Sequence, residues 1–63
     1  MNIANKLQEK RRKAGITQKQ AADAIGVQQS TISMWESGNS VPTVQTLLKA
    51  AEVYGCTAAE LLE

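Results

Sequence analysis

An uncharged polar stretch near the middle of the chain carries side chains that can recognise another molecule. On a helical projection of residues 28–36, at about 100° per residue, Ile32 and Trp35 lie on one side with Glu36 beside them. The opposite side carries uncharged side chains: Gln29, Ser30, Ser33 and Met34. Gln can bond adenine through both groups of its amide, Ser can donate or accept, and Met can pack against a thymine methyl. The pattern predicts a face that reads DNA bases; the alternative is an ordinary polar helix surface.

The composition leaves little room for catalysis or metal binding. The 63 residues include no His, one Cys, one Asp and five Glu. A nucleophile, a base and an orienting acid cannot be assembled from this set in any familiar way. One Cys without His also offers no set of zinc ligands. We therefore expect no enzyme activity, no metal, no cofactor and no small-molecule substrate.

The net charge of +1 hides an uneven distribution. Residues 1–26 carry six Lys and Arg against two acidic residues, a balance of +4. Residues 27–63 carry one Lys against four Glu, a balance of −3. A basic half can attract phosphate even when the whole molecule is nearly neutral. The alternative for such a cluster is a solvated helix face, so charge alone does not decide between the two.

Length and hydropathy predict one small domain over residues 1–63. The core must be thin, because the chain has no Phe, one Trp and one Tyr, and association is expected to add stability. Apolar residues never run more than two in a row, which excludes a membrane-spanning helix or a signal-peptide core. With a single Cys, this predicts a cytoplasmic protein that does not bind a membrane.

Four glycines divide the chain into helical segments: Gly15, Gly26, Gly38 and Gly55. Each follows an amphipathic segment, where a residue at positive φ ends a helix at low cost. The predicted helices cover about residues 3–14, 18–25, 28–36, 43–54 and 58–62. No segment alternates with period two, so the prediction is an all-α chain of five short helices.

Start signals and apolar spacing agree with these helices. Capping boxes are predicted for Thr17 with Gln20 and for Thr57 with Glu60, and Thr43 follows Pro42 at another start. The expected buried faces, in chain order, are Ile3, Leu7 and Ala14; Ala21, Ala22 and Ile25; Ile32 and Trp35; Val44, Leu47, Leu48 and Ala51; and Leu61 with Leu62.

The second and third helices are joined by only Gly26, Val27 and Gln28. So short a turn around a glycine makes the helices cross steeply, which is the helix-turn-helix arrangement, here at about residues 18–37. Ala22 is expected where the two helices approach most closely, and Gly26 in the left-handed conformation. Val27, Ile32 and Trp35 are expected to fill the space beneath the two helices.

At these residues the chain resembles the phage Cro/repressor (Xre-like) helix-turn-helix family. The most specific stretch runs from Thr17-Gln18 through Ala22 and Gly26-Val27 to Ser30-Thr31-Ile32-Ser33-x-Trp35-Glu36-x-Gly38. The following Pro-Thr-x-x-Thr-Leu-Leu segment and the Gly-Cys-Thr-x-x-Glu-Leu-Leu ending extend the resemblance over residues 7–62. It implies a lambda-repressor-like five-helix fold, with the second helix of the motif in the major groove of operator DNA. The length is most like that of a short Cro-type protein that represses transcription; the alternative is a fragment of a longer repressor, which would have the same sequence features.

The resemblance also implies which residues contact DNA. Positions matching Gln29 and Ser30 read bases in related phage repressors. Phosphate contacts are expected at the start of the second helix, where free amides favour an anion, and in the loop after the third helix. The expected phosphate-binding residues are Gln18, Lys19, Ser37, Asn39, Ser40 and Thr43, with Lys10 and Lys13 as outer contacts. The loop lacks Lys and Arg, so modest salt dependence is expected.

Other prominent residues are expected to be structural. The resemblance suggests that Arg11 and Glu36 form a partly buried ion pair. Trp35 is expected in the core rather than as a base-stacking platform, and Cys56 as a small buried hydrophobe. Gln28 stands where relatives often carry a Ser cap, which leaves the first residue of the third helix open.

A homodimer on a palindromic operator is the expected assembly, with half-sites about one helical turn apart. Its surface is predicted to involve Val41, Leu61 and Leu62 near the last helix, although either leucine can equally belong to the core. Two alternatives remain: an antitoxin or restriction-controller protein of the same fold with a protein partner, and a helical adaptor that binds no DNA.

Overall fold

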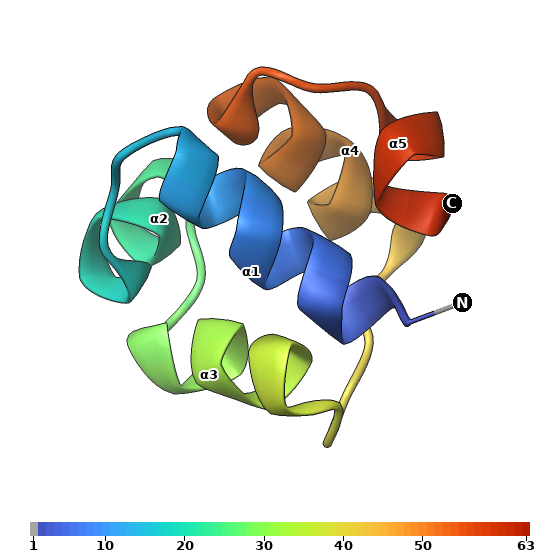
Figure 1. The fold of residues 1–63 in the computed structure, drawn as a ribbon. Coiled ribbons are helices and arrows are strands. Elements are labelled where there is room, and N and C mark those ends of the chain that lie inside the picture. Colours follow the sequence, from blue (N-terminus) through green and yellow to red (C-terminus); the bar gives the residue numbers. More distant parts are fainter. Residues whose placement is uncertain (1) are drawn as a thin grey trace.

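Five helices follow one another along residues 2–63, the part of the chain that the computed structural model describes (Figure 1). The bounds are α1 Ile3–Lys13, α2 Gln18–Ile25, α3 Gln29–Ser37, α4 Val44–Tyr54 and α5 Ala58–Leu62. These residues include no strand. The all-α prediction is confirmed, and every helix end lies within one residue of its predicted position. No helix within residues 2–63 has the length and apolar character needed to cross a membrane.

Threonine side chains cap three of the helix starts. The Thr17 hydroxyl accepts from the Gln20 amide at 3.1 Å, and the Gln20 side chain accepts from the Thr17 amide at 2.8 Å, so this capping box is complete. Thr43 caps α4 through the amide of Thr46 at 3.3 Å. At α5 the Thr57 hydroxyl accepts from the Glu60 amide at 3.1 Å, but the Glu60 carboxylate forms an ion pair with Lys10. Only half of that predicted box therefore forms.

Helix α1 contacts α3, α4 and α5, while α2 packs against α3 and α4 (Figure 1). The turn between α2 and α3 begins at Gly26, which has φ 90° and is the left-handed C-cap of α2. The amides of Gly26 and Val27 both donate to the carbonyl of Ala22, at 2.8 and 3.0 Å. The predicted helix-turn-helix geometry is thus present, with Ala22 buried between the helices.

The core is small and drawn from every helix. Its buried members are Leu7, Ala21, Ala22, Ile25, Ile32, Trp35, Leu47, Ala50, Ala51, Tyr54 and Leu61. Leu7, Ile32 and Leu61 are the largest side chains with no exposure. The core is rich in alanine, so close approach of the helices replaces the bulk that aromatic side chains would supply.

Three residues predicted for the core, on α1 and α4, are exposed instead. Ala14 is the exposed C-cap of α1, and Ala4 faces the core in its place. On α4, Val44 and Leu48 are exposed by 73% and 56%, whereas Ala50 and Tyr54 are buried. The buried stripe of α4 is therefore turned away from the predicted one, because Tyr54 belongs to the core whereas Val44 is exposed.

The last helix settles the ambiguity between its two leucines. Leu61 is fully buried in the core, while Leu62 is 44% exposed. Leu61 therefore cannot contribute to a surface that binds another molecule, and its predicted place in a dimer surface is wrong.

Candidate nucleic-acid interface

Helix α3 has one buried side and one exposed side, as predicted. Ile32 and Trp35 are buried. The exposed side carries Gln29, Ser30, Ser33, Met34 and Ser37. Met34 is 41% exposed, although methionine is among the residue types most often buried. The structure thus brings the predicted base-reading residues together on one face, and their role in reading bases remains a prediction.

The N-terminal end of α3 projects two consecutive glutamine side chains. Gln28 is the N-cap, in extended conformation, and its side chain makes no capping hydrogen bond. Its backbone carbonyl accepts from the Thr31 amide at 3.0 Å, so the backbone alone begins the helix. Gln28 and Gln29 are both exposed. From the sequence, Gln28 is interpreted only as a poor N-cap. Two consecutive glutamines at the start of the helix were the signal that Gln28, like Gln29, presents its carboxamide to the outside.

The hydroxyl of Ser37 is engaged within α3 rather than free. It donates to the carbonyl of Met34 at 3.1 Å, one turn earlier in the helix. This uses the one proton that Ser37 can donate, so toward DNA its oxygen can act only as an acceptor in this rotamer. A phosphate oxygen also accepts, which makes Ser37 a weaker phosphate ligand than the sequence suggested.

The start of α2 presents backbone amides and one ammonium group. Gln18 and Lys19 are its first two residues, directly after the Thr17 cap. Free amides and the helix dipole favour an anion at such an end. Lys19 is exposed and forms an i, i+4 pair with Asp23, with 3.6 Å between Nζ and Oδ2. An exposed pair of this kind is weak and leaves the ammonium available to a phosphate.

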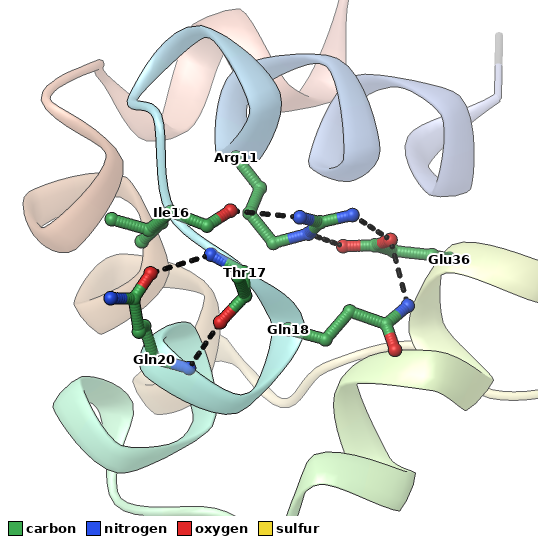
Figure 2. A network of polar contacts seen from close by, with 6 residues as sticks. All are labelled: Arg11, Ile16, Thr17, Gln18, Gln20 and Glu36. Carbon is green, nitrogen blue, oxygen red and sulfur yellow. Dashed lines mark hydrogen bonds and ion pairs between the residues drawn. The ribbon is translucent and has the colours of Figure 1, made fainter.

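Gln18 also takes part in a polar network that joins α1, α2 and α3 (Figure 2). Its Nε2 donates to Glu36 Oε1 at 3.1 Å. Arg11 donates from Nε to Glu36 Oε2 at 2.7 Å and from Nη2 to Oε1 at 3.0 Å. Arg11 Nη1 donates to the carbonyl of Ile16 at 2.8 Å, just before α2. The ion pair that the family resemblance implied is thus confirmed, whereas the bond from Gln18 was not foreseen.

This network fixes the start of α2 relative to the end of α3. Glu36 is almost completely covered, with 2% of its side chain exposed, and both of its oxygens accept from Arg11. The Glu36 carboxylate accepts hydrogen bonds from the Arg11 guanidinium, and this raises the pKa of Arg11 above its usual value despite partial burial. Arg11 is therefore permanently charged and neutralises Glu36 inside the domain.

The loop between α3 and α4 places three of the predicted phosphate ligands in sequence. Asn39 and Ser40 follow the C-cap Gly38, and their amides donate to the carbonyl of Met34 at 3.0 and 3.2 Å. Thr43 is exposed, and its oxygen is shared with the amide and hydroxyl of Thr46. The loop is held by its own backbone bonds. Asn39 is exposed beside the end of α3, and its side chain makes no hydrogen bond to another group of residues 2–63.

The two outer lysines do not share one location. Lys10 Nζ lies 3.3 Å from Glu60 Oε2, so its side chain turns toward α5. Lys13 is exposed in the last turn of α1, which leads into the loop before α2. Lys13 therefore lies at the end of α1 that leads to α2, whereas the side chain of Lys10 is engaged with α5.

Comparison with known proteins identifies a family and several similar transcriptional regulators. The family model described as Helix-turn-helix matches residues 7–61. The chain is 36% identical over 98% of its length to the HTH-type transcriptional regulator ImmR of Bacillus subtilis, and it covers 49% of that protein. It is likewise 36% identical to the HTH-type transcriptional activator BcrR of Enterococcus faecalis, covering 98% of this chain and 30% of BcrR. It is 34% identical to the cryptic phage CTXphi transcriptional repressor RstR of Vibrio cholerae, covering 97% of this chain and 54% of RstR.

A solved structure has the same fold. The P22 c2 repressor in complex with a synthetic operator superposes with a TM-score of 0.90 at 24% identity, covering 97% of this chain and 92% of that one. The chain spans about half the length, or less, of the curated relatives that it matches. With the family model covering nearly all of the described helices, the chain belongs to the Xre-like helix-turn-helix family.

Proposed function

We propose that residues 1–63 form a domain that binds double-stranded DNA sequence-specifically and regulates transcription as a repressor. Helix α3 enters the major groove, and the start of α2 and the α3–α4 loop contact the backbone on either side. Its neighbour in fold is a repressor bound to operator DNA, and its relatives are named as transcriptional regulators. In this proposal the protein works in the cytoplasm and uses neither a cofactor nor an enzyme activity.

One observation carries the proposal. Helix α3 exposes a face without any charged side chain, although charged residues make up 21% of the chain. A solvent-facing helix is normally covered with Lys and Glu, whereas base edges in the major groove are read by amide, hydroxyl and apolar groups. The basic N-terminal half supplies the attraction to phosphate, and its Lys19 lies on the helix that packs against α3.

The phosphate contacts are proposed for the groups that the structure leaves available. These are the amides at the start of α2, Lys19, Lys13, and the side chains of Asn39 and Ser40. Thr43, whose hydroxyl is bonded to Thr46, is proposed as a weaker contact. The carboxamide of Gln18 donates to Glu36. We therefore propose that Gln18 contacts phosphate mainly through its backbone amide, and that its side chain positions α2. Lys10 is proposed only as a distant contributor, because it is paired with Glu60.

We further propose that two copies bind together to a two-fold symmetric operator. The described residues expose four aliphatic side chains on or next to α4 and α5: Val41, Val44, Leu48 and Leu62. Val44 and Leu48 lie one turn apart on the same side of α4, and neighbouring exposed aliphatic groups are typical of an interaction surface. A second copy of the chain would cover them and place two α3 helices about one DNA turn apart, roughly 34 Å.

A random-duplex selection followed by mobility-shift titration tests the DNA proposal. Gln29→Ala and Ser30→Ala are expected to weaken binding to the selected duplex by about tenfold each while leaving binding to unrelated duplex unchanged. Gln45→Ala, an exposed glutamine on α4, is the matched control. If no duplex is enriched at low salt, or if both variants bind like the wild type, the adaptor alternative replaces this function.

A further inference from the structure

The exposed side of α3 carries no charged side chain. The only ionisable side chain of this helix is Glu36, which is covered and paired with Arg11. The cations of the chain lie on α1, α2 and α4, and none belongs to α3. In the major groove, guanine is most often read by Arg or Lys, which donate to its O6 and N7 together. Helix α3 offers no group of this kind.

The groups that α3 does offer match an A·T pair. Gln28 and Gln29 stand at the end of the helix that approaches base edges most closely in helix-turn-helix proteins. Within residues 2–63, no hydrogen bond involves either side-chain amide, so both are available as paired donor and acceptor. A carboxamide placed in this way fits adenine, which presents N7 as an acceptor and the N6 amino group as a donor.

Met34 adds an apolar contact one turn further along the helix. It is 41% exposed on the same face as Ser30 and Ser33, which carry short hydroxyl side chains that do not cover it. The 5-methyl group of thymine is the apolar feature of the major groove, and an exposed thioether can pack against it. Because a cytosine lacks this methyl group, Met34 discriminates against G·C pairs at the position that it faces.

From these three observations we infer that α3 reads a half-site composed of A·T pairs, with Gln28 and Gln29 bonded to adenines and Met34 packed on a thymine methyl. This inference rests on the proposed DNA-binding function and adds the chemical class of operator that the domain accepts. It also adds Gln28, which the sequence did not identify, to the base-reading residues. The hydroxyls of Ser30 and Ser33 can donate or accept, so they contribute base contacts in the specific complex without selecting A·T over G·C pairs.

Base analogues test this inference at single atoms. Once a duplex has been selected with the 63-residue chain, each thymine of a half-site is replaced in turn by uracil, which removes only the methyl group. Each adenine is replaced by 7-deazaadenine, which removes only the N7 acceptor. One uracil position is expected to weaken wild-type binding several-fold and to leave Met34→Ala unaffected. One or two 7-deazaadenine positions are expected to weaken the wild type about tenfold and to have no effect on the matching Gln28→Ala or Gln29→Ala variant.

Substitutions in the spacer between half-sites are the control, because they alter flexibility without meeting α3. Selected half-sites with G·C pairs at the protected positions would overturn the inference. So would an A·T-rich half-site that tolerates both analogues, because this pattern indicates that DNA shape rather than base edges is read. In either case the protein still binds a specific duplex and the proposed function stands. A selection that enriches nothing instead refutes the proposed function itself.

Discussion

The guanidinium of Arg11 meets the carboxylate of Glu36 at two points, with Nε 2.7 Å from Oε2 and Nη2 3.0 Å from Oε1. The pair joins the last turn of α1 to the last turn of α3, and 2% of the Glu36 side chain is exposed. In the same network, Gln18 on α2 donates to the carboxylate, and the guanidinium donates to the Ile16 carbonyl. The orientation of α3, on which any reading of DNA depends, is therefore set by a charge pair rather than by apolar packing alone.

Removing either member of this pair is expected to destabilise the domain strongly. Arg11→Ala leaves a covered carboxylate without its cation, and Glu36→Ala leaves the cation without its anion; each should cost about 3 kcal/mol of unfolding free energy. Urea unfolding followed by the fluorescence of the single Trp35 measures both. The double variant should lose clearly less than the sum, because the second substitution removes a group that is already unpaired. Small and additive losses would show that the pair contributes little.

The hydroxyl of Tyr54 is the basis of a second prediction. Within residues 2–63 it is buried without a hydrogen-bond partner. Burial, with a further contribution from the nearby Glu36 carboxylate, raises the pKa of Tyr54 from 10.0 to about 12. Replacing it by Phe removes an unsatisfied polar group, so Tyr54→Phe is expected to stabilise the domain at neutral pH by about 1 kcal/mol.

The same substitution should change the response to alkali. Between pH 10 and about 12 the unfolded chain releases a proton that folded Tyr54 retains. The folded state then binds more protons, so stability falls as the pH rises through this range. Tyr54→Phe should remove that part of the alkaline loss, and the absorbance titration of the single tyrosine should show the raised pKa directly. A variant less stable than the wild type at neutral pH would mean that the hydroxyl has a partner in solution.

The ion pair between Lys10 and Glu60 predicts a small effect at acid pH. A hydrogen bond from the Lys10 ammonium holds the pKa of Glu60 below its usual value of 4.5. The unfolded chain takes up this proton first, so the contribution is complete above pH 4.5 and is lost as the pH falls through the lower folded value. Glu60→Gln should lower Tm slightly at neutral pH and narrow the gap to wild type in acid. Glu52→Gln, which disturbs only a pair within α4, is the control, and equal pH profiles for the two variants would contradict the prediction.

The proposed dimer surface can be tested on α4. Leu48 is 56% exposed, so Leu48→Glu should leave the fold of one copy intact, within about 0.5 kcal/mol. If a second copy covers this position, the charge should shift sedimentation toward the monomer and make operator binding weaker and less steep. Gln45→Glu introduces the same charge at another exposed position of α4 and should have a smaller effect. Sedimentation and operator binding of Leu48→Glu that match those of the wild type would show that Leu48 is not at the interface.

Much of the site was predictable because its signals are local. The caps at Thr17 and Thr43, the left-handed Gly26 and the uncharged face of residues 29–34 depend on neighbours within a few residues. The position of Ile32 and Trp35 opposite these uncharged residues also predicted that one side of the third helix is exposed. The bond from Gln18 to Glu36 was not predictable, because it joins residues 18 positions apart whose distance depends on how α2 and α3 cross.

The sequence by itself therefore determined the helices, their ends and the helix-turn-helix turn, since each follows from backbone preferences and capping over short distances. Only the tertiary structure decided which side of α4 is buried. Val44, Leu47, Leu48 and Ala51 have the same i, i+3, i+4, i+7 spacing as Leu47, Ala50, Ala51 and Tyr54. Periodicity cannot choose between two such stripes, because the choice depends on the space that the other helices leave. Packing against α1, α2 and α5 selected the stripe that ends at Tyr54, and this left Val44 and Leu48 exposed.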